Sequence, residues 1–244
     1  MRLTNRKVLH KIDQAFRYDK KYIERAITSI SSLLKHPPLS KNLLAEWLLE
    51  KLSGNLDREV IAGIMELIIA KFLIHTLPSQ FIILDVPGQK PTGKKTTDFA
   101  LKGTCPVEIK RISGDLPALR DNVVKANKQH RETRYAEYPK KGLTFVCLSN
   151  ESLEAVTTRD YLDGLTREIA LLFRDLDDTA AIFVCIDEFN LNDTSQGSTE
   201  VHVGFTIAPF SPDSETYQDV VPEELRKIIR QPAALDPRIL DEEE

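Results

Sequence analysis

The sequence lacks the residue patterns that mark several protein classes. Its three cysteines, Cys105, Cys147 and Cys185, lie in or beside separate apolar runs and show no paired spacing. This excludes a disulfide-stapled scaffold and predicts reduced, buried thiols in a cytoplasmic protein. The five histidines are scattered, and none has the spacing of zinc ligands. No internal repeat or low-complexity linker is present.

Long apolar runs are also missing. The longest mostly apolar run, 60–77, carries Glu66 and Lys71 and has a helical period, which predicts a buried helix and not a membrane span. The first residues contain no apolar segment of the kind found in secretory signals. The chain has 244 residues, 41% of them hydrophobic and 29% charged, and this composition is typical of a globular protein with a full core.

Neither sign of charge dominates the chain, but the charge is unevenly distributed. The net charge is −4, yet residues 89–141 contain 13 basic and 6 acidic residues, and residues 211–244 contain 4 basic and 10 acidic residues. Phosphate binding depends on local charge, so the basic segment is compatible with a nucleic-acid partner. A solvated charged surface would explain the same segment equally well.

The apolar patterns predict helices first and an α/β arrangement afterwards. Helical periods mark three segments within 4–76, and short β-rich runs separated by turn residues begin at residue 81. Strands are expected at 81–86, 97–102, 106–112, 143–149, 180–187 and 200–210, the last of them towards an edge. Further helices are expected at 115–138, 160–176 and 221–230. The run 143–149 is continuously apolar, which is typical of a strand covered on both faces.

One glycine-rich segment has the spacing of a phosphate-binding loop. Gly88, Gly93 and Lys94 fit the Gly-x-x-x-x-Gly-Lys pattern. Such a loop needs a helix beginning at its lysine, but the residues that follow are β-rich. Lys95 also stands where a serine or threonine would reach magnesium. We therefore expect a hairpin connection near a phosphate-handling site, and not a nucleotide-binding loop.

A second pattern in the same region has the composition of a metal site. The strand period places Glu108 and Lys110 on one face, and Asp98 opens the preceding strand of the same expected hairpin. Two neighbouring carboxylates repel unless a cation lies between them. With oxygen ligands and no histidine or cysteine nearby, that cation would be Mg²⁺ or Mn²⁺. The alternative is a hairpin with a surface Glu–Lys pair.

Asp98 followed by Glu108-Ile109-Lys110 resembles the PD-(D/E)XK nuclease superfamily. The core of that family runs helix, three-stranded meander, helix, strand, and residues 57–149 are expected to follow this order. Thr97 stands where the family often has proline. The resemblance implies an α/β, restriction endonuclease-like fold, a mixed sheet flanked by helices. The implied parts are an N-terminal helical element at 1–56, the nuclease core at 57–210, and a C-terminal helix with an acidic tail at 211–244.

The resemblance also implies an activity, that of a Mg²⁺-dependent endonuclease that hydrolyses DNA phosphodiester bonds in restriction, phage defence or DNA repair. Mn²⁺ would substitute for Mg²⁺. The implied metal ligands are the side chains of Asp98, Glu108 and Glu66 and the backbone carbonyl of Ile109. Glu59 is the alternative to Glu66 on the first helix, and Lys110 would position the attacking water. A nuclease-like fold that binds nucleic acid or protein without cleavage is the alternative function.

The basic segment supplies the expected nucleic-acid contacts. They are Lys94, Lys95, Arg111, Arg120, Lys125, Lys128 and Gln129. Tyr135 is a weaker candidate, and His130 is expected to be a solvated residue on the same helix. Cutting both strands usually needs two active sites, so a homodimer is expected. An activating or regulatory protein partner is a further expectation, and the acidic tail is a candidate inhibitory segment.

Overall fold

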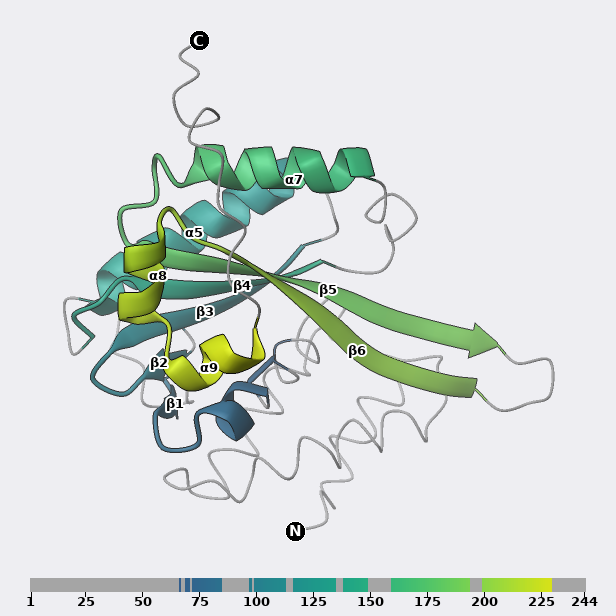
Figure 1. Cartoon of the computed structure of the whole chain (residues 1–244), viewed down its shortest axis with the longest axis horizontal. Coiled ribbons are helices and arrows are strands. Elements are labelled where there is room, and N and C mark those ends of the chain that lie inside the picture. The colour runs from purple at the N-terminus through teal and green to yellow at the C-terminus, as the bar shows by residue number, and fades with distance from the viewer. Residues whose placement is uncertain are drawn as a thin grey trace.

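The computed structural model describes residues 66, 69–70, 72–84, 97, 99–112, 116–134, 138–148, 159–193 and 199–229. These residues form a six-stranded mixed sheet flanked by helices (Figure 1). The expected α/β class is thereby confirmed. The N-terminal helical element at 1–56 and the acidic tail lie outside the described residues. Within the described ranges, every helix is too short or too polar to span a membrane.

One half of the sheet is an antiparallel meander. It contains β1 (Phe81–Ile83), β2 (Phe99–Leu101) and β3 (Cys105–Ile112). The turn between β2 and β3 includes Gly103 at φ 64°, a left-handed conformation that a residue with a Cβ adopts at a cost. This tight turn fixes the register in which Phe99 faces Val107.

The other half of the sheet is mainly parallel. α5 (Leu116–Arg134) connects β3 to β4 (Gly142–Leu148), and α7 (Arg159–Leu172) connects β4 to β5 (Thr179–Asp193). β3, β4 and β5 are parallel neighbours. Parallel strands need such crossover connections, so each helix is placed against the sheet that it connects.

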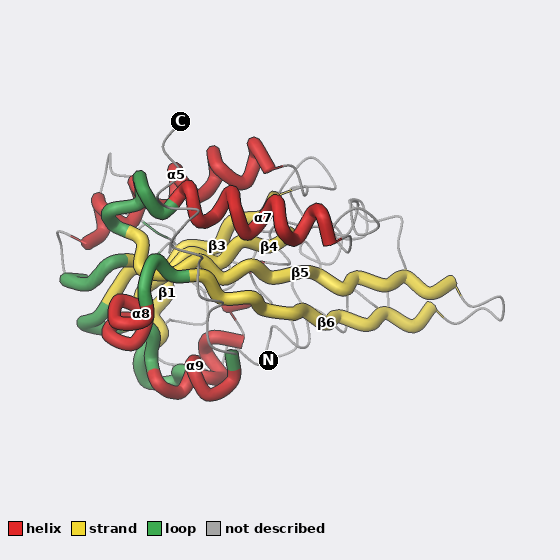
Figure 2. Tube along the Cα trace, turned by 45° about the horizontal axis from the view of Figure 1, so that its top comes forward, coloured by secondary structure: helices red, strands yellow, loops and turns green. Residues whose placement is uncertain are grey.

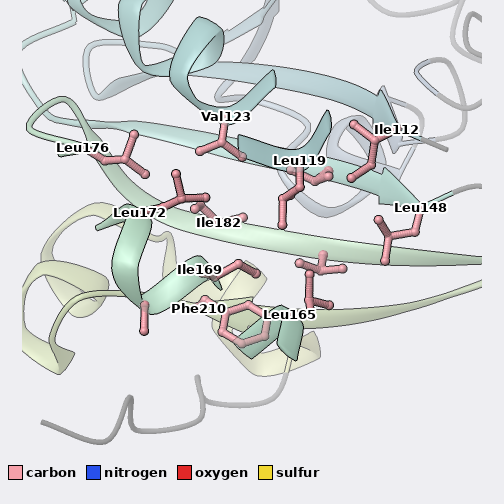
Figure 3. Close-up of a cluster of buried hydrophobic side chains, with 13 residues drawn as sticks. Ile112, Leu119, Val123, Leu148, Leu165, Ile169, Leu172, Leu176, Ile182 and Phe210 are labelled. Carbon is pink, nitrogen blue, oxygen red and sulfur yellow. The ribbon is translucent and has the colours of Figure 1, made fainter. Parts of the chain in front are cut away.

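Both crossover helices cover the same face of the sheet (Figure 1). Val123 from α5 and Leu165 and Ile169 from α7 belong to one buried apolar cluster that also contains Ile182 of β5 (Figure 3). Alternation along a strand places Val146 and Val184 in the same cluster. This covered face is also the face that carries the candidate functional residues of β3.

Aromatic residues cover the opposite face. The rings of Phe145 and Phe183 stack at 4.6 Å, and the ring of Tyr217 lies 6.4 Å from that of Phe183. Tyr217 belongs to α8 (Ser214–Val220), which therefore packs on this side. All seven residues of β4 are buried, as expected for a strand covered on both faces.

The hairpin of β5 and β6 (Thr199–Phe210) extends past the rest of the sheet. The last pair between β4 and β5 is Leu148 with Ile186, whereas pairing between β5 and β6 continues to Asp193 with Thr199. Figures 1 and 2 show the two strands projecting together as a ribbon. The position of β6 at the edge confirms the prediction.

Several boundaries differ from the sequence prediction, and β1, β2 and α7 are shorter than expected. β5 runs beyond the expected end at residue 187 because pairing with β6 overrides the low strand propensity of its asparagines and aspartates. The helix expected at 221–230 is present as α9 (Glu223–Ile228), and α8, which precedes it, was not predicted. Asp213 is the N-cap residue of α8, and its Oδ1 accepts a hydrogen bond of 2.6 Å from the amide of Thr216. Pro222 is the N-cap residue of α9.

Candidate functional site

Glu108 is a buried carboxylate in the middle of β3. Only 1% of the residue is exposed. Residues four positions apart on a strand share a face, so the side chain of Glu108 lies on the same face as that of Ile112, which α5 covers. A carboxylate in such a place is destabilising unless it is paired. The ammonium of Lys110, two residues later on the same face, forms an ion pair with Oε1 of Glu108.

Lys110 also reaches α5. Its Nζ donates a hydrogen bond of 2.7 Å to Oε1 of Gln129. The lysine side chain is 19% exposed, so its ammonium contacts the buried carboxylate and is still partly accessible to solvent. An ammonium has three N–H donors, and the described residues Glu108 and Gln129 accept two of them. The structure therefore brings together three of the predicted site residues.

Asp98 lies outside the described residues, but both of its neighbours are placed. Thr97 is fully buried, and its backbone N–H donates a hydrogen bond of 3.0 Å to Oγ1 of Thr133 on α5. Thr133 Oγ1 in turn donates to the carbonyl of Gln129 at 2.9 Å. The segment before β2 is thus fastened to the helical turn that carries Gln129.

Thr97 and Thr133 are site-supporting residues that the sequence did not reveal. The sequence pattern marks Thr97 only as the residue that stands in place of proline, and it gives no signal for Thr133. Their contact joins residues 36 positions apart, so no local pattern could have found it.

Glu66 lies in a helical segment, as expected, and is partly buried with its Oε1 atom enclosed. Ile109 is buried on β3. Within the described residues, no three His, Cys, Asp or Glu side chains gather as a metal-binding group. The metal site predicted here includes Asp98, which these residues do not cover, so it stays a prediction.

His130 is not solvated, and that prediction was wrong. The residue is fully buried, and its Nε2 lies 2.8 Å from Oγ1 of Thr144 on β4. Burial, followed by the positive charge of Lys110, lowers the pKa of His130 to about 3, so its imidazole is neutral at neutral pH. The signal was present in the sequence, because Leu119, Val123 and His130 follow helical spacing on the buried face of α5.

The predicted nucleic-acid contacts have different environments. Lys125 and Lys128 are exposed on α5. Arg120 is also exposed, but its guanidinium lies 4.0 Å from a carboxylate oxygen of Glu168 and 3.9 Å from one of Asp175, which partly neutralises its charge. The side-chain oxygen of Gln129 accepts a hydrogen bond from Lys110. Lys94, Lys95 and Tyr135 lie outside the described residues, as does the side chain of Arg111.

The arrangement of Glu108, Lys110 and Gln129 has a definite chemical capacity. It presents a lysine ammonium at a partly open position, held by acceptors from a strand and a helix. Such an ammonium can orient a polar substrate or water and can stabilise developing negative charge. No family model, curated protein or solved structure matches the chain.

Proposed function

We propose that the chain is a metal-dependent endonuclease of the PD-(D/E)XK type that hydrolyses DNA phosphodiester bonds, with phage defence or DNA repair as its setting. The observation that carries the proposal is the joint placement of Glu108, Lys110 and Gln129 on β3 and α5. A surface Glu–Lys pair does not account for it, because Glu108 is buried and the lysine has a second acceptor on another element.

The order of elements supports the restriction endonuclease-like fold. A helical segment at 72–76 precedes the meander of β1, β2 and β3, and α5 then leads to β4. β4 is parallel to β3. This is the order that the resemblance implies. Fold alone does not establish function, so the proposal depends on the residues of the site.

The chemistry of the donor set fits a hard divalent cation. Glu108 is a buried carboxylate that already adjoins a positive charge. The imidazole of His130 does not add a nitrogen ligand beside Glu108, because its Nε2 contacts Thr144. In the proposal, Mg²⁺ or Mn²⁺ is held by Asp98, Glu108, Glu66 and the carbonyl of Ile109. The ion would supply Lewis acidity towards the phosphate and lower the pKa of a bound water.

The residues of the chain have separate roles in this proposal. Lys110 orients the attacking water through an N–H and stabilises the negative charge that develops on phosphate. Gln129 fixes the ammonium, and Glu108 balances its charge. Lys125 and Lys128 on the exposed side of α5 bind the DNA backbone. The other proposed phosphate contacts are Lys94, Lys95, Arg111 and Arg120. Two copies of the chain, with or without a regulatory protein, would cut both strands.

The test is cleavage of plasmid, linear, single-stranded and branched DNA with Mg²⁺ or Mn²⁺, and with the metal chelated. Lys110→Met should abolish cleavage, whereas Lys227→Ala, which changes an exposed residue paired with Glu223 on α9, should retain it. Tight DNA binding without cleavage would favour a binding module over a nuclease. Equal cleavage by the wild type and Lys110→Met would refute the proposed role of this lysine.

A further inference from the structure

His130 and Gln129 are adjacent on α5 but contact two different strands. Gln129 accepts a hydrogen bond from Lys110 on β3, and His130 contacts Thr144 on β4. Thr144 is fully buried and is the register partner of Glu108. One turn of the helix is therefore tied to both neighbouring strands at the level of the candidate site.

The imidazole of His130 occupies the space beside Gly142 of β4 that a side chain would otherwise fill. A Cβ atom at Gly142 would lie 2.2 Å from Cγ and Nδ1 of His130, so only glycine leaves room for the ring. The ladder between β4 and β5 shifts register between Gly142 and Leu143. The N–H of Gly142 donates a hydrogen bond of 2.7 Å to the carbonyl of Asp178, which holds this irregular start of the strand in place.

α5 is fastened to the beginning of β5 on the same side. Oδ1 of Asn127 accepts hydrogen bonds of 3.0 Å from the amide of Asp178 and from the hydroxyl of Thr179. Nε of Arg131 lies 2.7 Å from Oδ2 of Asp178. These contacts fix the end of the helix along the sheet. The contact between His130 and Thr144 fixes its depth above β4, directly beside Gln129.

The buried ring has one defined hydrogen-bonding role. Among the described residues, nothing hydrogen-bonds Nδ1 of His130, whereas Nε2 faces the hydroxyl of Thr144. We assign the imidazole proton to Nε2, because a buried N–H without an acceptor is rarer than a bare acceptor. With this tautomer, His130 donates to Thr144 Oγ1.

We propose that His130, through its hydrogen bond to Thr144, is a positioning residue that sets where Gln129 holds the ammonium of Lys110. The inference rests on the proposed function for its catalytic meaning, but the coupling itself is a property of the fold. His130 does not contact substrate or metal in this proposal. It acts by keeping α5 at the depth at which Gln129 and Lys110 meet.

The first measurement is the NMR signal of the Lys110 ammonium in the full chain labelled with ¹⁵N-lysine. The signal is assigned by its absence in Lys110→Met. His130→Leu and Thr144→Val each remove one partner of the hydrogen bond and should shift or broaden this signal. His130→Gln and Thr144→Ser restore an N–H donor and a hydroxyl, respectively, and should bring it back.

A matched control separates positioning from general stability. Val123 is a fully buried residue on the same helix, in the apolar cluster. Val123→Ala should lower Tm while leaving the Lys110 signal at its wild-type position. If His130→Leu and Thr144→Val also lower Tm and leave the signal in place, His130 only packs the core and the inference is overturned. Thr144→Val decides the question if His130→Leu does not fold.

Cleavage kinetics supply the second readout. Misplacement of a catalytic group by about 1 Å can lower a rate by about 100-fold, so His130→Leu should reduce kcat by about this factor and leave KM nearly unchanged, with recovery in His130→Gln. If His130→Leu cleaves DNA at the wild-type rate, the inference is overturned and the proposed function stands. A wild-type protein that never cuts DNA, together with a Lys110 signal that shifts or broadens in His130→Leu and Thr144→Val, would support the coupling and overturn the proposed function.

Discussion

Nζ of Lys110 on β3 and Oε1 of Gln129 on α5 lie 2.7 Å apart, although 19 residues separate them in the sequence. The contact ties the crossover helix to the strand from which it departs. Because Lys110 also pairs with the buried carboxylate of Glu108, a change in any one of the three side chains should affect both the stability of the fold and the site.

Lys110→Met should destabilise the protein because it keeps the length of the side chain but leaves Glu108 buried without its cation. Breaking a buried ion pair in this way lowers the free energy of unfolding by about 3 kcal/mol. Urea denaturation of Lys110→Met and of the double variant Glu108→Gln/Lys110→Met provides the check. The double variant should recover most of the loss, and equal losses in both would contradict the pairing.

Gly142→Ala should destabilise the chain by overpacking His130. Forcing a methyl group into a filled site typically lowers the free energy of unfolding by about 1–3 kcal/mol. Gly103→Ala is the matched control, since its Cβ would meet no atom within 4 Å and only its positive φ opposes the change. Gly142→Ala combined with His130→Ala should lose less stability than the sum of the single changes. Additive losses would show that Gly142 and His130 do not compete for space.

The stability of the protein should fall as pH falls below neutrality, in part through His130. Its folded-state pKa, about 3, is lower than the usual value of 6.5, so between these values the unfolded chain binds more protons than the native protein. The stabilising neutral form is fully present above the unfolded pKa and is lost as pH decreases towards 3. One proton changes the free energy of unfolding by up to about 1.4 kcal/mol per pH unit.

The measurement is urea denaturation of the wild type and His130→Gln at pH 7, 6 and 5. The wild type should show the steeper loss of stability. Equal slopes would mean that His130 is protonated to the same extent in both states, which would contradict its burial as a neutral ring.

Thr133→Val should weaken the support beneath the segment that contains Asp98. The change leaves the buried amide of Thr97 without its acceptor, which lowers the free energy of unfolding by about 1–3 kcal/mol. Thr133→Ser retains the hydroxyl and is the control. Titration with Mn²⁺, followed by electron paramagnetic resonance, should show weaker binding in Thr133→Val alone. Unchanged binding in a folded Thr133→Val protein would separate this anchor from the metal site.

Local periodicity predicted most of the described fold. The alternation in β3 correctly placed Glu108 and Lys110 on one face, and the helical period of α5 brought Gln129 within reach of them. The same period could have shown that His130 is buried, but the surrounding basic residues suggested a solvated helix. Charge composition reports on the exposed face of a helix and not on the face that it turns to the sheet.

The long-range anchors could not be predicted from these patterns. The contact of Thr97 with Thr133 and that of His130 with Thr144 depend on how far α5 lies above each strand. The requirement for glycine at 142 has the same origin, because the group that fills its space comes from the helix. Residue spacing fixes direction within one element, whereas these contacts depend on the distance between two elements.

The projecting end of the β5–β6 hairpin gives the backbone amides of β5 two levels of protection from solvent. Up to Ile186, β5 has a strand on each side, whereas from Asp187 to Asp193 the described partner is β6 alone. Backbone amides in the outer section can therefore open to solvent without separating β4 from β5, and those in the inner section cannot. Backbone amides of β5 beyond Ile186 should therefore exchange their hydrogens faster than those before it. One uninterrupted strand then belongs partly to the core and partly to a ribbon that opens independently.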